Sequence, residues 1–488
     1  MNISMDLVTV MPELWLAGLA MLLLLIGVFG GDRLTQPLTL AAIAGLAFAA
    51  LGIALFSISP AVSAQPPIPA FGGMFVNDAF SRFAKLLSLG ASALALAMAL
   101  PYLKARKIAH FEYPVLALFA TLGMMLMVSA NDLLALYVGL ELQSLSLYVL
   151  AAFQRDEQKS SEAGLKYFVL GALSSGLLLF GASWLYGLSG TTNFIQLKDF
   201  FSAEAASPGA LVALIFVMAG LAFKIAAVPF HMWAPDVYEG APTPVTGFFA
   251  SAPKVAAMAL LIRVLFVPMQ GMIHEWQQIL IFAALASMMI GGFAAIVQTN
   301  IKRLMAYSAI GHAGYVLAGL AAGSEEGIQA ALVYLSIYVL NTLGAFAVIL
   351  AMRRGGAMVE TLADLAGLSR SRPLLALAMT VFMFSLAGVP PLAGFFGKFY
   401  VFMAAVHAGL YAVAIIGVLT SAVAAYYYLK IVKLMYFDDS RQQDIDPVPE
   451  LGLRAVVTVA ALAMVLFTLM PSPIIDGAHS AAAGLFGR

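Results

Sequence analysis

Long apolar stretches alternate with short polar segments along almost the whole chain of 488 residues. A helix needs about 20 apolar residues to cross the hydrocarbon core of a bilayer. Fourteen stretches reach about that length, and we predict that each forms a membrane-spanning helix of an all-α polytopic protein. The predicted spans cover about 10–30, 38–59, 76–101, 112–130, 132–153, 163–188, 209–232, 243–267, 276–298, 301–322, 327–351, 373–405, 408–436 and 452–471.

Lysine and arginine gather in the loops that follow odd-numbered spans. Seventeen basic residues lie there, against only Lys198 and Arg488 on the other side. Cytoplasmic loops carry an excess of Lys and Arg, so we predict that odd-to-even loops face the cytoplasm and that both termini lie outside. The seventeen are Arg33, Lys104, Arg106, Lys107, Arg155, Lys159, Lys166, Lys302, Arg303, Arg353, Arg354, Arg370, Arg372, Lys430, Lys433, Arg441 and Arg454.

The composition agrees with a protein whose solvent is a bilayer. Hydrophobic residues make up 62% of the chain and charged residues 10%, where a soluble domain averages about 25% charged residues. The 25 basic residues balance the 25 acidic residues, so the chain has no basic field for nucleic acid. Its first residues lack the basic segment of a cleaved signal peptide, and we expect the first span to be retained.

The residues that the chain lacks exclude several cofactor chemistries. Without cysteine, it cannot hold thiolate-bound iron–sulfur clusters, zinc of the cysteine type or disulfides. It also lacks the glycine-rich motifs of nucleotide sites. We therefore expect no cofactor in this chain, and any redox cofactors of its reaction would lie in another chain.

Six basic residues and one central acid fall inside predicted spans. A charge at the centre of a lone helix costs about 2.5–3.5 kcal/mol on insertion scales, so such residues usually face the bundle interior and mark an ion path. Arg82 and Lys85 lie in the first turns of the third span, and we interpret them as residues of its end face. Arg263 lies towards the outer end of the eighth span, from which its side chain can extend to the membrane surface.

Glu141 and Lys224 are the central pair of this pattern. Glu141 lies near the middle of the fifth span, and Lys224 lies in the seventh span, five residues before Pro229. Proline removes a backbone hydrogen bond, and broken helices line ion sites in many transporters. We favour ion translocation for both residues. The alternatives are a protonated structural carboxyl and a packing kink whose lysine pairs with Glu141.

Three further residues continue the polar series. Lys254 lies midway along the eighth span, at a depth that should match Lys224. His312 lies midway along the tenth span, where a proton relay and a hydrogen-bonded structural histidine are equally compatible with the sequence. Lys398 follows Pro390 and Pro391 in the long twelfth span, which repeats a break beside a lysine.

These residue types suit protons better than metal ions. Burial disfavours the charged form of lysine and of a carboxyl group, whereas a nearby opposite charge favours it. Movement of either partner can therefore switch a buried lysine between charged and neutral, which arginine does not allow. Metal sites need several carboxylates or histidines together, and only one acid lies in mid-membrane.

The break and lysine recur five spans apart, in spans seven and twelve. An odd offset inverts the direction of the chain across the membrane, so we predict two inverted five-helix repeats, an architecture of many transporters. We divide the chain into N-terminal helices over 1–111, a first repeat over 112–267, a second repeat over 268–436, and a loop with a last helix over 437–488.

Two motifs resemble a known family. The stretch 223–245, with its continuation through Pro253 and Lys254, closely resembles the antiporter-like proton-pumping subunits of respiratory complex I. So does the stretch from 300 to His312. The resemblance covers roughly 75–435, and the stretches 162–168 and 171–176 are similar to the N-type branch of the family in particular.

Two features separate the chain from paralogues in that family. M-type subunits usually carry a glutamate where Lys398 stands, and L-type subunits carry a long lateral helix after the last span. The resemblance implies that Glu141 and Lys224 are the controlling pair. It implies further that Lys254 and His312 continue a central polar axis, and that Lys398 is the terminal lysine near the exit.

The resemblance also implies an assembly. The chain would be a proton-translocating subunit of an NADH:quinone oxidoreductase in the inner membrane of a bacterium, with both termini in the periplasm. FMN, iron–sulfur clusters and quinone would belong to other subunits. Its partners would be the lipid bilayer, M-type and K-type membrane subunits and, through them, the peripheral redox arm.

Three other functions remain open at this point. A subunit of a multisubunit cation/proton antiporter would share the fold and the buried charges, although the stretch 162–176 argues against it. A membrane scaffold that transports nothing would tolerate packing residues in place of the buried charges. A transporter of organic solutes would need a substrate pocket, for which the sequence gives no signature.

Overall fold

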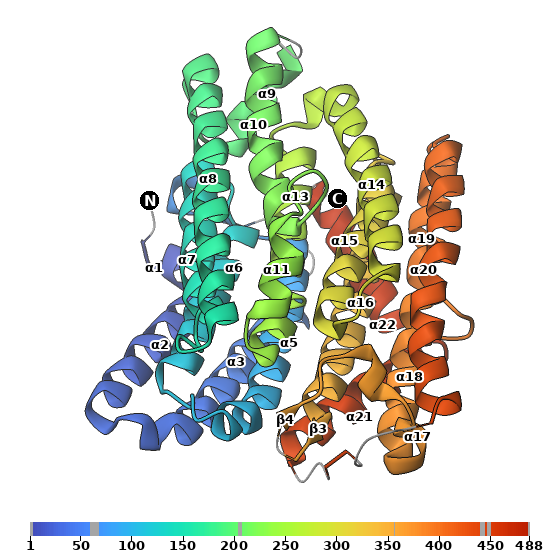
Figure 1. Ribbon diagram of the computed structural model, residues 1–488. Helices are drawn as coiled ribbons and strands as arrows, with labels where there is room; N and C mark the ends of the chain where they lie inside the picture. Colours follow the sequence, from blue (N-terminus) through green and yellow to red (C-terminus); the bar gives the residue numbers. More distant parts are fainter. Residues whose placement is uncertain are drawn as a thin grey trace.

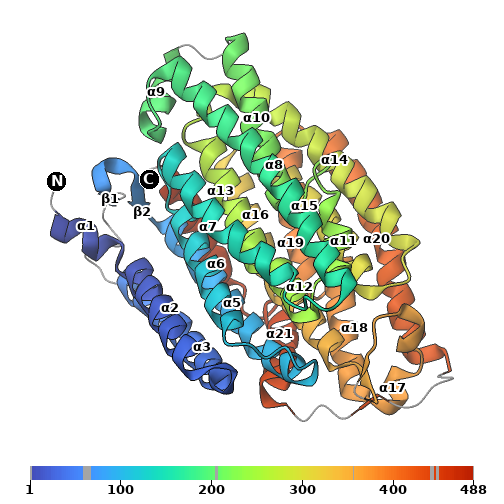
Figure 2. The same cartoon turned by 60° about the vertical axis from the view of Figure 1, so that its left-hand side comes forward.

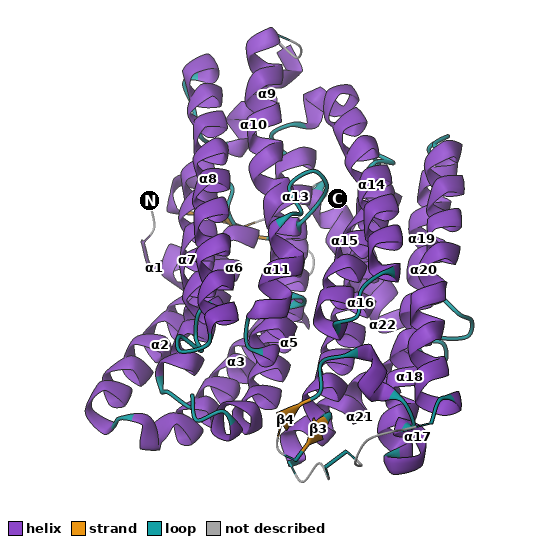
Figure 3. Cartoon of the chain, in the orientation of Figure 1, coloured by secondary structure: helices purple, strands orange, loops and turns teal. Residues whose placement is uncertain are grey.

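The computed structural model describes residues 3–58, 68–203, 207–355, 357–439, 445–446 and 450–486, and almost all of it is helix (Figure 3). The α-helices are α1 (Ile3–Thr9), α2 (Met11–Gly30), α3 (Thr35–Ile58), α5 (Ala79–Ala105), α6 (Glu112–Val128), α7 (Leu133–Ala151), α8 (Gln158–Ser189), α9 (Phe194–Ala203), α10 (Pro208–Ile225), α11 (Trp233–Gly240), α12 (Thr243–Phe249), α13 (Ala252–Phe266), α14 (Ile273–Ile296), α15 (Ile301–Leu320), α16 (Glu325–Ala351), α17 (Leu368–Ser371), α18 (Pro373–Ala387), α19 (Ala393–His407), α20 (Tyr411–Phe437), α21 (Leu451–Leu466) and α22 (Ser472–Leu485). Short 3-10 helices cover Asp32–Leu34, Phe71–Gly73, Gln270–Met272 and Leu362–Leu365, and the strands are β1 (Ile68–Ala70), β2 (Phe75–Asn77), β3 (Arg353–Arg354) and β4 (Ala357–Met358).

Each of the fourteen predicted spans coincides with one helix or with two successive helices, which confirms the predicted membrane fold. Within the described chain, ten helices are long and apolar enough to cross a membrane, and α6, α18 and α21 are shorter apolar helices. The seventh span is broken between α10 and α11 and the twelfth between α18 and α19, as predicted. The eighth span is also broken, between α12 and α13, which the sequence analysis did not predict.

The bundle has two ends, which we name the α9 face and the α17 face (Figure 1). The hairpin of β1 and β2 lies at the α9 face with the start of α9 (Figure 2), because Asn131 and Asn193 both donate hydrogen bonds to the Gly73 carbonyl, at 2.9 and 3.3 Å. Helix α22 ends beside Ala79 at the start of α5. Both ends of the described chain therefore lie at the α9 face.

Two groups of helices form the two sides of the bundle. Helices α6 to α13 stand beside α14 to α20, and the N-terminal helices α2 and α3 pack on the outside of the first group (Figures 1 and 2). Every residue of α13 is buried, and so are nearly all residues of α15 and α16. These three helices form the centre in which Lys254 and His312 lie. Arg441 and Arg488 of the charge count lie outside the described residues.

Glycine lets α6 and α7 pack in backbone contact. A Cβ atom added to Gly123 would lie 2.4 Å from the main-chain nitrogen of Gln143, and one added to Gly139 would lie 2.8 Å from that of Met127. Small residues permit such close helix packing in membranes. This close packing holds α7 against α6 at Gly139, two residues before Glu141.

Candidate functional site

The break in the seventh span exposes main-chain groups that neighbouring residues then satisfy. Helix α10 ends at Ile225, and Ala226 adopts a left-handed conformation with φ of 57°. Beyond it, the Val228 amide donates to Ser287 Oγ at 2.9 Å, and the Trp233 indole donates to the Phe223 carbonyl at 2.9 Å. The break is thus a defined structure, and buried carbonyl groups of α10 are available to other donors.

Lys224 lies in the last turn of α10 and reaches α7. Its ammonium donates to Ser144 Oγ at 2.7 Å and approaches the Tyr148 hydroxyl at 3.4 Å. Glu141, one turn before Ser144, accepts a short hydrogen bond from Ser175 on α8. Glu141 and Lys224, both within the described chain, form no direct ion pair. The Ser144 hydroxyl that Lys224 contacts donates to the Leu140 carbonyl at 2.6 Å.

Lys254 contacts the same break, at the end of α10, from α13. It lies in the first turn of α13, just after the break of the eighth span at Ala250 and Ser251, and is almost completely buried. Its ammonium donates to the Ile225 carbonyl at 2.8 Å and lies 6.0 Å from the Trp233 ring centre. The prediction that Lys254 and Lys224 lie at similar depth is confirmed, because Lys254 contacts the residue next to Lys224.

His312 lies in a cluster of hydroxyl groups in the second group of helices. Its Nδ1 is 2.5 Å from the Tyr334 hydroxyl, and its Nε2 is 3.0 Å from the Tyr428 hydroxyl. Tyr428 in turn lies 2.5 Å from Ser308 Oγ. Each hydroxyl can donate or accept, so this row of groups is able to pass a proton and is equally able to hold a neutral imidazole.

Lys398 lies on α19 and closes the break of the twelfth span. Its ammonium donates to the Ala387 carbonyl at 2.9 Å and to Ser421 Oγ at 2.7 Å, and it lies 5.0 Å from the ring centre of Tyr315. The Tyr315 ring is 5.7 Å from the imidazole of His312. Lys398 and His312 therefore belong to one buried cluster.

The two breaks repeat one local design. In each, a residue in the left-handed conformation lies three positions before a proline: Ala226 before Pro229, and Gly388 before Pro391. Pro390, the other predicted breaker, lies between Gly388 and Pro391. A lysine then caps the last helical carbonyl, which carries the partial negative charge of a helix C-terminus. Lys254 caps Ile225 and Lys398 caps Ala387, so Lys398 corresponds in contact to Lys254 and not to Lys224.

Two unpartnered hydroxyl groups flank the space between the clusters of Lys254 and His312. The Tyr238 hydroxyl and Thr342 Oγ1 are buried without a hydrogen-bond partner among the described residues. The Tyr238 ring lies 6.3 Å from Trp233, which Lys254 approaches, and Thr342 is one turn from Tyr338, whose ring is 5.3 Å from His312. Buried polar groups without protein partners commonly bind water.

The prediction that Arg263 extends to the membrane surface is wrong. Arg263 is buried: it forms a two-pronged ion pair with Asp78 at 2.9 Å and donates to the Val128 carbonyl. Lys85, interpreted as an end-face residue, is also buried, in an ion pair with Glu13 at 2.6 Å. Helices from other parts of the chain cover both side chains. The sequence of one span does not show such contacts.

The sequence analysis missed most partners of the buried lysines. Ser144, Ser175 and Ser421 provide hydroxyl groups to Glu141 or to lysines, and Tyr334 and Tyr428 provide them to His312. Ser175 lies within 171–176, a stretch that carries the family resemblance, which was the available signal for that residue. No pattern along the sequence distinguishes the tyrosines from other aromatic residues of apolar spans.

Two broken spans, each closed by a buried lysine inside an all-helical membrane bundle, define an antiporter-like ion-translocating subunit. The sequence over residues 130–424 matches the family described as NADH:quinone oxidoreductase/Mrp antiporter, TM, and the chain belongs to this family. The expected resemblance is thereby confirmed.

Individual relatives agree with that assignment. The chain is 55% identical over 488 residues to NADH-quinone oxidoreductase subunit N of Paramagnetospirillum magneticum, covering 99% of each chain. It is 35% identical, with a TM-score of 0.81, to a chain in the structure of respiratory complex I from Thermus thermophilus with bound aureothin, covering 95% of this chain and 98% of that one. A chain of the Mrp complex from Dietzia is 25% identical, with a TM-score of 0.83 and coverage of 98% of both chains.

Proposed function

We propose that this chain translocates protons as the N-type membrane subunit of an NADH:quinone oxidoreductase. The observation that carries the proposal is the set of three mid-membrane lysines, Lys224, Lys254 and Lys398. Each is held by hydroxyl or main-chain oxygens and none by a carboxylate. Such a lysine can lose its proton without leaving an unpaired buried carboxylate behind.

The path that we propose starts at Glu141 and Lys224 and passes through Lys254 and His312 to Lys398. Lys224 contacts Ser144, which lies one turn after Glu141 on α7, and the break at Ile225 brings Lys224 beside Lys254. Water at the unpartnered Tyr238 and Thr342 hydroxyls would bridge the interval to the His312 cluster. We propose His312 as a relay because both of its nitrogens contact hydroxyl groups.

We also propose an assembly, which the relatives' name, NADH-quinone oxidoreductase subunit N, supports. NADH oxidation, FMN, iron–sulfur clusters and quinone chemistry would belong to other subunits, with M-type and K-type subunits as the membrane neighbours. The chain would contribute no redox centre. We propose that the α17 face is cytoplasmic, that both termini are periplasmic in the inner membrane, and that the repeats 112–267 and 268–436 form half-channels flanked by 1–111 and 437–488.

The test is proton uptake by inverted membrane vesicles of the source cells, driven by NADH. Lys224→Ala should retain assembly with flavin- and cluster-bearing subunits but lose most proton uptake per quinone reduced. Normal uptake by that variant would support the scaffold function. Transport that depends on sodium, with no flavin protein co-purifying, would instead support the antiporter function that the similarity to the Mrp chain allows.

A further inference from the structure

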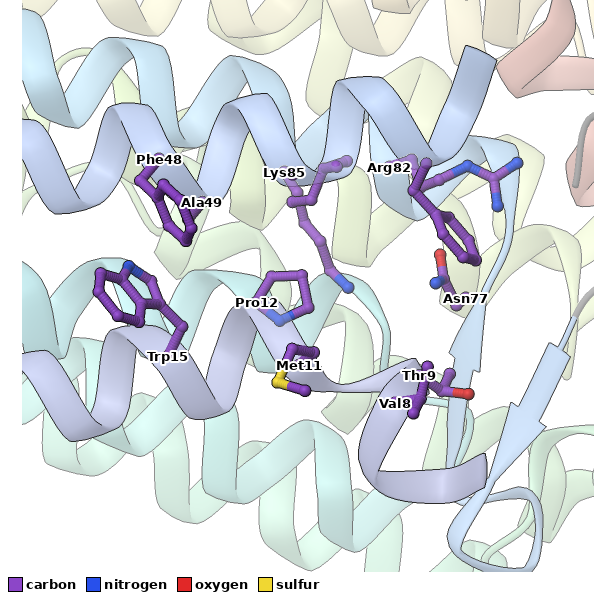
Figure 4. A pocket seen from close by; sticks show the side chains of 13 residues that line it. Val8, Thr9, Met11, Pro12, Trp15, Phe48, Ala49, Asn77, Arg82 and Lys85 are labelled. Atoms are coloured by element: carbon purple, nitrogen blue, oxygen red, sulfur yellow. The ribbon is translucent and has the colours of Figure 1, made fainter. Parts of the chain in front are cut away.

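A cavity of about 270 Å³ lies between α1, α2, α3 and α5 near the α9 face, apart from the lysine series. One end is polar and carries Asn77, Arg82 and Lys85, and the other carries the rings of Trp15 and Phe48 (Figure 4). The two rings lie 4.8 Å apart. A cavity with one charged and one aromatic end has the form of a site for an amphiphile.

Arg82 and Lys85 are the cations that line the polar end. Lys85 pairs with Glu13 at 2.6 Å, and nearby Asp78 pairs with Arg263 at 2.9 Å. No described acid forms an ion pair with Arg82, and no described residue accepts a hydrogen bond from its side chain. A part-exposed guanidinium at the α9 face without such a partner can bind an anion with several acceptor oxygens.

The same end holds an acceptor that lacks a donor. Asn77 lines the cavity, and its Oδ1 is buried and has no hydrogen-bond partner among the described residues. Asn77 is only 9% exposed, so bulk water does not serve this oxygen. An unsatisfied buried acceptor costs about 1–3 kcal/mol. The occupant of this end should therefore supply hydrogen-bond donors as well as an anion.

The aromatic end opens to the exposed surface of the bundle. Trp15 is 41% exposed and Phe48 is 59% exposed, and Val8 and Met11 at the same cavity are more than half exposed. In a bilayer these side chains face hydrocarbon. An acyl chain can lie against them while its head group occupies the polar end.

We propose that this cavity binds one anionic glycerophospholipid, phosphatidylglycerol, from the leaflet at the α9 face. Its phosphate accepts hydrogen bonds from Arg82, a glycerol hydroxyl donates to Asn77 Oδ1, and an acyl chain packs on Trp15 and Phe48. The single negative charge pairs with Arg82. Choline supplies no donor, and ethanolamine would leave the positive charge in place. An apolar helix of another protein would satisfy neither group.

Photolabelling of the full chain in vesicles tests the proposal without any measurement of transport. Vesicles contain the purified membrane complex and a trace of phosphatidylglycerol with a diazirine on its acyl chain, and labelled peptides are identified by mass spectrometry. We expect labelling of the segments around Trp15 and Phe48. Matched probes with choline or ethanolamine head groups should label them about tenfold less, a difference of about 1.4 kcal/mol in binding free energy.

Four variants locate the binding site. Arg82→Gln should abolish the preference for phosphatidylglycerol, and Arg82→Lys should keep part of it. Gly52→Leu should block labelling, because Gly52 lines the cavity and an added Cβ there meets no atom within 4 Å. Gly18→Leu is the control, since Gly18 has the same open surroundings on α2 but does not line the cavity.

Equal labelling by the three probes would overturn the proposal, and so would a preference for ethanolamine. Labelling by phosphatidylglycerol that persists in both Arg82→Gln and Gly52→Leu would also overturn it. If no probe labels these segments in the complex, another protein covers the cavity and the proposal is wrong.

Discussion

Lys254 donates a hydrogen bond across 2.8 Å to the main-chain carbonyl of Ile225, the last residue of α10. The contact connects the break of the seventh span with that of the eighth, because α10 ends at Ile225 and α13 begins just before Lys254. A helix C-terminus favours a cation, so the ammonium group is stabilised by the break itself. Loss of its proton would weaken that cap, which couples the charge of Lys254 to the local structure beside Lys224.

Substitution of Lys254 tests this coupling. Lys254→Met should lower NADH-driven proton uptake at least about tenfold, or about 1.4 kcal/mol, because methionine neither carries a proton nor donates to Ile225. Lys254→Arg keeps the charge and the donor but does not release a proton, so it should transport as poorly while melting at a higher temperature than Lys254→Met. Vesicle uptake at matched protein level is the measurement. Wild-type uptake in the arginine variant would mean that Lys254 is only a helix cap.

Ser144, which Lys224 contacts on the helix of Glu141, allows a matched comparison. Glu141→Ala should leave the protein inserted but remove most coupled transport, and Glu141→Asp should be milder because the carboxylate remains. Ser144→Ala should reduce uptake to an intermediate level, since Lys224 loses its 2.7 Å partner. Ser146→Ala is the control, because both serine hydroxyls donate to a carbonyl within α7 but no described lysine contacts Ser146. Equal effects of the two serine variants would contradict a link through Ser144.

The role of His312 can be separated from packing through its two tyrosine partners. Tyr334→Phe and Tyr428→Phe each remove one hydroxyl group from an imidazole nitrogen and leave the ring in place. A relay requires that uptake falls severalfold in both, beyond any change in melting temperature. Tyr113→Phe, in a buried tyrosine of α6, is the control. If melting temperature falls while uptake per quinone is unchanged, His312 is structural.

Lys398 is expected to exchange its proton with the periplasmic side. Lys398→Met should block release, and Lys398→Arg should also fail because arginine stays charged. Lys398→Glu should transport better than either, because a buried carboxyl can titrate near neutrality. Proton uptake across this series is the measurement. An arginine variant that works as well as lysine would identify Lys398 as a fixed charge beside Ala387.

The proposed orientation is open to direct measurement. Reporter fusions near Arg106, Lys159 and Arg370 should be active on the cytoplasmic side, because the helix ends that carry them lie at the basic α17 face (Figure 1). A fusion within 189–192, at the end of α8, should be active outside. Reversal at two of these sites would place the α17 face in the periplasm and reverse the proposed direction of transport.

The membrane spans were predictable because the bilayer imposes one length on every one of them. All fourteen predicted stretches contain helices, and the prolines at 229 and 390–391 marked the breaks of the seventh and twelfth spans. The break at Ala250 and Ser251 was missed, although Pro253 follows it at the start of α13. Proline is common at the beginning of a helix, so Pro253 alone does not reveal that an earlier helix has ended.

The sequence by itself indicated the membrane spans, the charged residues at the middle of those spans and the family, since hydrophobic length and residue type are properties of single segments. Only the tertiary structure decided the partners: Ser144 rather than Glu141 for Lys224, Ile225 for Lys254, Asp78 for Arg263 and Glu13 for Lys85. Helices that are apolar all round carry little information about which side faces which neighbour. Close packing across glycines and the two helix breaks settles that choice, so the partner of each buried charge follows from contacts between distant segments.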